Sequence, residues 1–257
     1  MDVDGGAPPG SPKAEQWAPS DLDDEDIGSE ASTESGCESL DLESQGEPSQ
    51  SDLPVTFLIF DWDDTLLPLT WLRQQGLLGS QRTQLGEEQR AQLSGAARCV
   101  ARTLKLAKQL GRVAIVTNAE AGWVEASMQR FMPALAPLLD GMQVTSARTA
   151  YQWRAPDAPP EWKRMAFERE IGEFCQRLPD GCWANVVSLG DLHCERDALF
   201  EAIEDAPDCW GKALKLLERP SLEQLVRQHG LIQECLAQVV AHNGCLDMSV
   251  EGAGGRT

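Results

Sequence analysis

The chain has 257 residues, of which 41 are acidic and 22 are lysine or arginine, so its formal net charge at pH 7 is −19. That charge argues against nucleic acids and anionic membranes as partners, because both would repel the protein. No apolar stretch approaches the roughly 20 residues of a membrane span, and the start, Met1-Asp-Val-Asp4, is unlike a signal peptide. We therefore expect a cytoplasmic protein that could also enter the nucleus.

The first 53 residues form an acidic tail. They contain fifteen acidic side chains and one basic side chain, Lys13, and are rich in serine, glycine and proline. Such a segment cannot bury enough apolar surface to offset its ordering entropy, so we expect it to be disordered. It could bind a basic protein partner, with phosphorylation at Ser20, Ser35 or Ser49 adding charge, or it could serve only as a solubilising leader.

From residue 54 onward, short apolar runs alternate with amphipathic segments. The pattern predicts a folded domain over 54–246 and a flexible C-terminal tail over 247–257. The expected strands are 55–60, 113–116, 142–145, 185–189 and 213–217. The expected helices are 82–109, 120–132, 165–176, 196–203 and 222–241. This alternation predicts an α/β fold with a doubly wound, Rossmann-like parallel sheet of about five strands and helices on both faces.

Two carboxylates follow the first apolar run directly, in Asp61-Trp62-Asp63-Asp64-Thr65. Alternate residues of a strand share a face, so Asp61 and Asp63 would lie on one side of the chain. Clustered carboxylates are costly unless a cation or a proton separates them. The pair is therefore typical of a metal-assisted site, in which one carboxylate attacks and the other moves protons.

Other polar residues follow later elements in a fixed order. Thr117-Asn118 ends the second apolar run, Lys163 comes next, and Gly190-Asp191 through Glu195 ends a third run. In open parallel sheets, ligands bind beyond the carboxyl ends of the strands, so one cleft could collect Asp61, Thr117 and Asp191.

The ordered set resembles the four motifs of the haloacid dehalogenase (HAD) superfamily, over roughly residues 54–242. Those motifs are an aspartate pair DxDxT, a Ser or Thr after the second strand, a lone lysine, and an acidic GDxxxD/E. The resemblance implies that Asp61 is the nucleophile that forms an aspartyl-phosphate. It implies that Asp63 protonates the leaving oxygen and then activates water, which favours a phosphatase over a dehalogenase.

The resemblance also implies Mg²⁺ as the cofactor. Its ligands would be the Asp61 carboxylate, the backbone carbonyl of Asp63 and the Asp191 carboxylate, with Glu195 or Asp197 holding a bound water. Thr117 would bind the phosphoryl oxygens, helped by backbone N–H groups of the helix that starts after Asn118.

Three further assignments concern side chains around the site. Lys163, or the adjacent Arg164, would pair with Asp61 and the phosphate. Arg148 could contact the substrate, and Trp62 could line the mouth of the site with its indole ring.

A cap domain would be inserted between Thr65 and Val113 or between Asn118 and Lys163. Helices and a strand that the core needs account for most of both segments, so we expect no sizeable cap domain. The site would then be open to a bulky substrate or a phosphoprotein. The sequence predicts a Mg²⁺-dependent HAD-type phosphatase of the capless kind. Two alternatives stay open: a phosphotransferase that uses the same site, and a non-catalytic interaction module with the HAD fold.

Overall fold

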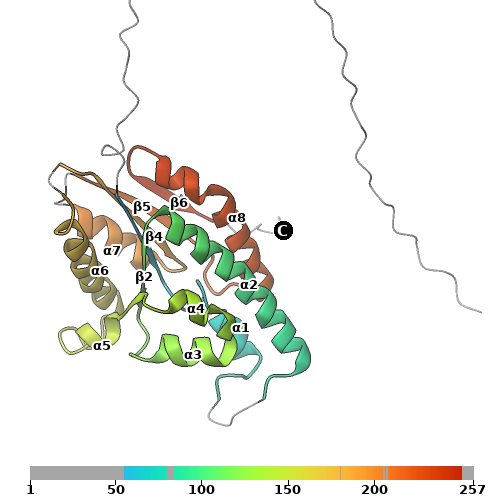
Figure 1. Ribbon diagram of the computed structural model, residues 1–257. Coiled ribbons are helices and arrows are strands. Elements are labelled where there is room, and N and C mark those ends of the chain that lie inside the picture. The colour runs from blue at the N-terminus through green and yellow to red at the C-terminus, as the bar shows by residue number, and fades with distance from the viewer. Residues whose placement is uncertain (1–54, 80–83, 180, 205, 207, 251–257) are drawn as a thin grey trace, which may run out of the picture. The chain divides into compact units, whose positions relative to one another are not determined.

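Figure 1 shows a computed structural model of the chain, which describes residues 55–79, 84–179, 181–204, 206 and 208–250. The predicted acidic tail (1–53) and residues 251–257 of the predicted C-terminal tail lie outside these ranges. None of the helices in the described part has the length and apolar character needed to cross a membrane.

The described chain is an α/β structure around one parallel sheet, which confirms the predicted fold class. The strand order is β3-β2-β1-β4-β5-β6, and every neighbouring pair is parallel. The strands are β1 (Val55–Phe60), β2 (Arg112–Thr117), β3 (Gln143–Ser146), β4 (Ala184–Gly190), β5 (Cys209–Lys215) and β6 (Leu246–Ser249).

Strand β6 lies where the sequence predicts a flexible tail. Its residues are mostly exposed and carry no buried apolar run, so its sequence has no strand signal. It forms by pairing with β5, from Lys212 opposite Leu246 to Lys215 opposite Ser249. The sheet therefore has six strands instead of about five, and residues up to Val250 are described by the structure.

Helices cover both faces of the sheet (Figure 1). Helix α2 (Glu87–Leu110) packs against α8 (Leu222–Ala241) on one face, and α6 (Pro159–Cys175) packs against α7 (His193–Ile203) on the other. The shorter elements are α1 (Leu69–Gln74), α3 (Trp123–Phe131), the 3-10 helix η1 (Pro133–Leu135), α4 (Ala136–Leu139) and α5 (Ala147–Tyr151).

The central strand β1 supplies both cores. Leu58 and Phe60 belong to the core under α2 and α8, whereas Phe57 and Ile59 belong to the core under α6 and α7. All four side chains are fully buried. A strand covered by helices on both faces needs such a continuous apolar run, and this is why β1 is evident from sequence.

Four helices begin at residues that the sequence pattern does not predict, among them α2, which starts at Glu87 instead of residue 82, and α7, which starts at His193 instead of residue 196. Helix α3 starts at Trp123 instead of residue 120, because Gly122 before it has a left-handed backbone with φ of +86°. Helix α6 starts at Pro159 instead of residue 165, since proline is favoured in the first turn. Lys163 therefore lies inside α6, close to its N-terminal end.

The connections that could hold a cap are occupied by short elements. Between β1 and β2 the described residues form α1 and α2, and between β2 and α6 they form α3, η1, α4, β3 and α5. No further domain occurs in the described ranges of these two segments.

Candidate active site

A pocket of about 840 Å³ opens beyond the carboxyl ends of the strands. Residues that follow β1, β2, β3, β4 and β5 all contribute to its lining. The predicted site residues in its wall are Asp61, Asp63, Thr117, Asn118, Arg148, Lys163, Asp191 and Glu195. The structure thus collects in one pocket every predicted site residue except Trp62.

Lys163 and Asp61 form a buried ion pair at this pocket. Lys163 Nζ lies 2.6 Å from Asp61 Oδ1 and 3.0 Å from Glu195 Oε1, and it donates a hydrogen bond of 2.8 Å to the Val116 carbonyl. The lysine side chain is only 1% exposed. One ammonium group thus joins α6, β1, β2 and α7.

Burial and charge oppose each other in this pair. Burial raises the pKa of Asp61 to about 7, against the opposing positive charge of Lys163. Burial lowers the pKa of Lys163, but the charges of Asp61 and Glu195 outweigh it and hold that pKa above its ordinary value. Lys163 therefore carries a positive charge at neutral pH, next to the carboxylate that would attack.

The structure also shows which of the two adjacent basic residues, Lys163 or Arg164, pairs with Asp61. Arg164 points to the surface of α6, where it pairs with Glu161 and Glu168. The basic group beside Asp61 is therefore Lys163.

Asp63 is held by an indole. Trp123 Nε1 donates a hydrogen bond of 2.8 Å to Asp63 Oδ1. Burial raises the pKa of Asp63, and the Trp123 hydrogen bond opposes that shift. A carboxyl group with a raised pKa is suited to proton transfer near neutral pH.

The loop after Asp63 turns sharply at Asp64, whose φ is +57°. Its carboxylate accepts hydrogen bonds from the Thr70 backbone N–H (2.7 Å) and from Thr70 Oγ1 (2.6 Å). These bonds connect the loop to the first turn of α1. They also stabilise the left-handed backbone of Asp64, a conformation that residues with short polar side chains adopt more readily than most.

The prediction that Trp62 lines the mouth is wrong. The ring is fully buried, belongs to the core under α2 and α8, and is absent from the pocket wall. Its Nε1 donates a hydrogen bond of 2.9 Å to Ser127 Oγ on α3. Trp62 anchors the loop between the two aspartates instead of meeting a ligand.

Thr117 ends β2, and Asn118 begins the loop that follows; both side chains form hydrogen bonds near the pocket. Thr117 Oγ1 accepts a hydrogen bond of 3.1 Å from the Ala119 N–H, and Asn118 Nδ2 donates one of 3.2 Å to the Pro159 carbonyl. The buried Asn118 Oδ1 has no partner among the described residues. Because α3 starts at Trp123, residues 118–122 present a loop to the pocket instead of the helix end that we expected.

Asp191 and Glu195 follow β4 with different surroundings. Burial and the negative charges of Asp61, Glu195 and Asp64 raise the pKa of Asp191 to about 8. Glu195 is engaged by the protein, since Oε1 meets Lys163 and Oε2 accepts from the Leu192 N–H at 3.0 Å. Asp197, the alternative to Glu195, is half exposed and pairs with Arg196.

Gly190 permits this arrangement. A Cβ atom at Gly190 would collide with the side chain of Glu195. The glycine before Asp191 thus lets Glu195 fold back toward β4 and reach Lys163.

The oxygen donors in the pocket are of the kind that binds Mg²⁺, but they are few. Within the described ranges, no group of three or more His, Cys, Asp or Glu side chains is arranged to hold a metal ion. Asp61 and Asp191 share the pocket, and burial together with the negative charges of Asp61, Glu195 and Asp64 raises the pKa of Asp191. Two carboxylates and the backbone carbonyl of Asp63 are hard oxygen donors of the kind Mg²⁺ takes, with waters in its other positions.

Arg148 lies on α5, where its guanidinium is 3.4 Å from Glu120 in a pair that is largely exposed. Several other lining residues are not predicted from sequence as site residues, among them Arg73, Trp123 and Arg219. Of these three, Trp123 has a signal in the sequence, because it follows the Thr117-Asn118 motif closely.

No protein-family model, curated protein or solved structure matches the chain.

Proposed function

We propose that the protein is a Mg²⁺-dependent phosphohydrolase that works through an aspartyl-phosphate on Asp61. The observation that carries this proposal is the contact of 2.6 Å between Lys163 Nζ and Asp61 Oδ1 in the wall of the pocket, with Asp63 two residues further along the same wall. The order of motifs that resembles the HAD superfamily supports the same chemistry.

The reaction would proceed in two displacements. With Oδ1 engaged by Lys163, Asp61 Oδ2 attacks the phosphorus of a monoester, the bond from phosphorus to the ester oxygen breaks, and Asp63 gives that oxygen a proton. Asp63 then takes a proton from water, whose oxygen attacks the same phosphorus. The bond from phosphorus to Asp61 breaks, which releases inorganic phosphate and restores the carboxylate.

The other residues would neutralise and orient the phosphoryl group. Lys163 offsets the repulsion between Asp61 and the incoming dianion. Thr117 Oγ1 already accepts the Ala119 N–H, so its own hydrogen is available to a phosphoryl oxygen. Mg²⁺, held by Asp61, Asp191 and the Asp63 carbonyl, would supply further charge neutralisation.

The open pocket suits a bulky or protein substrate, because no further domain covers it within the described ranges. The same openness would admit an acceptor other than water, and this keeps phosphotransfer as a second candidate. A phosphohydrolase releases inorganic phosphate in step with the alcohol, whereas a phosphotransferase releases less phosphate when an acceptor alcohol is added.

The test is hydrolysis of p-nitrophenyl phosphate by the purified protein with Mg²⁺ and with a chelator. We expect Mg²⁺-dependent turnover that Asp61→Asn abolishes, because an amide cannot form an acyl-phosphate. Asp140→Asn is the matched control, since this aspartate is exposed and lies outside the pocket wall. A folded wild-type protein without turnover on p-nitrophenyl phosphate or phosphopeptides would favour the interaction module instead.

A further inference from the structure

Three arginine side chains line the pocket around the proposed catalytic group: Arg73, Arg148 and Arg219. Arg73 lies on α1 after β1, Arg148 on α5 after β3, and Arg219 in the connection after β5. Arg73 and Arg219 are exposed, and Arg148 is partly buried. All three guanidinium groups are therefore within reach of a ligand that enters from solvent.

The strand order distributes these arginines on both sides of Asp61. In the order β3-β2-β1-β4-β5-β6, β3 lies two strands from β1 on one side and β5 lies two strands away on the other. Neighbouring strands are about 4.8 Å apart, so the segments that carry Arg148 and Arg219 each begin about 10 Å to one side of Asp61. Arg73 follows β1 itself.

These arginines have few charged partners within the described structure. Arg73 and Arg219 form no salt bridge with any described residue, and Arg148 has the exposed pair with Glu120 and a hydrogen bond of 3.3 Å from its Nε to Gln152 Oε1. An exposed pair of this kind contributes little free energy, so an incoming carboxylate can replace Glu120. The arginines are thus available to an anionic ligand.

Arg219 also has an unusual backbone. Its φ is +49°, in the left-handed region that non-glycine residues rarely adopt, and Pro220 follows it. Such a conformation persists where the surrounding structure requires it, and residues of this kind cluster at binding sites.

From this placement we infer that the substrate is a phosphorylated residue in an acidic peptide, whose flanking carboxylates meet the arginines on either side. This inference rests on the proposed phosphohydrolase and names the class of its substrate. An extended peptide advances about 3.3 Å per residue, so a residue about three positions before or after the phosphorylated one lies about 10 Å away. That reach matches the placement of Arg148 and Arg219.

Other ligands use the arginines less well. A small phosphate ester engages Lys163 and Thr117 and leaves both flanking arginines without a partner. A nucleic acid brings a long run of phosphates toward a protein of net charge −19, which repels it. A short acidic peptide places its few charges where the arginines are.

The test compares two synthetic phosphoserine peptides, one with Glu three residues before and after the phosphoserine and one with Gln at both positions. Wild-type protein should show a kcat/KM for the acidic peptide higher on the order of tenfold, the scale of two exposed ion pairs. The combined Arg148→Gln and Arg219→Gln variant should bring the ratio of the two peptides close to one. Added salt should also reduce the ratio.

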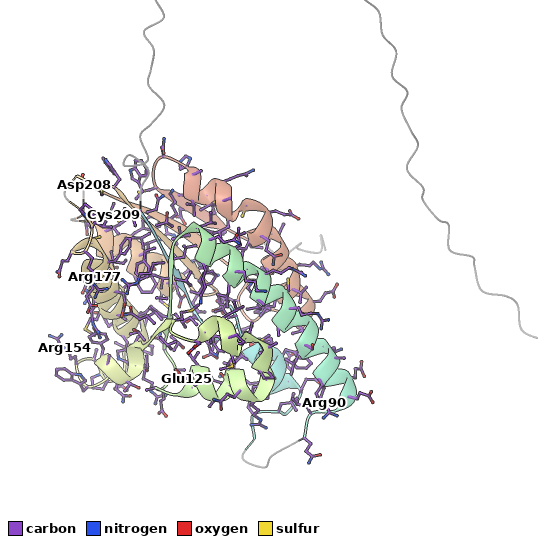
Figure 2. The ribbon with its side chains drawn as sticks, viewed as in Figure 1. Arg90, Glu125, Arg154, Arg177, Asp208 and Cys209 are labelled. Carbon is purple, nitrogen blue, oxygen red and sulfur yellow. The ribbon has the colours of Figure 1, made fainter. Side chains whose placement is uncertain are left out.

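Arg90→Gln is the matched control. Arg90 lies in the first turn of α2 (Figure 2). It is exposed, has no salt bridge with a described residue and is not part of the pocket wall. This variant should keep the full preference for the acidic peptide. A wild-type ratio near one, or an unchanged ratio in the double arginine variant, would overturn the inference.

Binding separates this inference from the proposed catalysis. Fluorescence anisotropy with labelled phosphopeptides and the Asp61→Asn protein measures the same preference without turnover. Preferential binding of the acidic peptide, lost with both arginines, would support the substrate class even if wild-type protein hydrolysed neither peptide. Turnover of p-nitrophenyl phosphate with equal binding of both peptides would retain the proposed function and reject the acidic substrate. A nucleoside triphosphate that competes better than the acidic peptide would also reject it.

Discussion

Trp123 Nε1 lies 2.8 Å from Asp63 Oδ1, so the proposed general acid is oriented by an indole from the first residue of α3. Trp123 does not need to touch the reacting atoms to matter. It fixes one carboxyl oxygen of Asp63 and leaves the other to carry the proton.

Replacing Trp123 with Phe should therefore slow proton transfer while keeping a large apolar ring. Loss of one hydrogen bond of about 1 kcal/mol corresponds to roughly a fivefold change in rate. We expect this loss in kcat with an alkyl phosphate, whose leaving group needs a proton, and little loss with p-nitrophenyl phosphate. An equal loss on both substrates would mean that Trp123 serves packing alone.

Removing the charge of Lys163 should damage stability as well as turnover. Lys163→Met leaves Asp61 and Glu195 close together without their cation, and breaking a buried pair in this way typically costs about 3–5 kcal/mol. Urea denaturation of the variant measures the change. Arg164→Met, on the exposed side of the same helix, should cost less than about 1 kcal/mol; equal losses would contradict the buried ion pair.

Gly190→Ala tests the approach of Glu195 to β4. The added methyl group collides with the Glu195 side chain, and overpacking of this kind costs about 1–3 kcal/mol. Because Glu195 also holds Lys163, turnover of p-nitrophenyl phosphate should fall. Gly172→Ala is the control, since nothing lies near a Cβ there and alanine favours the α6 helix by about 1 kcal/mol. A tolerated Gly190→Ala would show that Glu195 moves freely.

His229 should make stability depend on pH. Its Nδ1 lies 2.9 Å from Thr103 Oγ1 and its Nε2 2.9 Å from the Thr65 carbonyl, and burial lowers its pKa to about 4 from an ordinary 6.5. The unfolded chain therefore binds a proton between pH 6.5 and 4 that the folded protein does not. The stabilisation is complete above pH 6.5 and is lost as pH falls toward 4, by about 3 kcal/mol in order of magnitude.

Comparing wild type with His229→Gln at pH 7.5 and pH 5 isolates this effect. Asp61 and Asp191 have raised pKa values, which make folding less favourable as pH rises, but they are present in both proteins. The difference in unfolding free energy between the two proteins should shrink at pH 5. A difference that does not change with pH would rule out the buried neutral imidazole.

The sequence predicts the elements that are buried and the residues at their ends. Strand β1 is a continuous apolar run because helices cover both of its faces, and the polar residues after β1, β2 and β4 converge because parallel strands end at one edge. Strand β6 and the six-residue α1 are not predictable, because their stability comes from tertiary packing and not from their own pattern.

The site shows the same division. The burial of Trp62 could have been predicted, since strand alternation turns it away from Asp61 and Asp63. Arg219 could not, because its place in the pocket depends on a left-handed backbone that no local pattern indicates. The choice between Lys163 and Arg164 likewise depends on where α6 begins and which of its sides faces β1.

The central place of β1 has a consequence for synthesis of the chain. Its partners β2 and β4 are made later, and Ala184, which pairs with Val55, follows it by more than a hundred residues. Because a chain is synthesised at about 5–20 residues per second, β1 lacks its partner β4 for on the order of ten seconds. During that time its unpaired edge could aggregate with other chains. Acidic residues stand on both sides of it, the first 53 residues before and Asp61, Asp63 and Asp64 after. During synthesis, the negative charges of the pocket aspartates would therefore oppose aggregation of the apolar nascent strand with other chains.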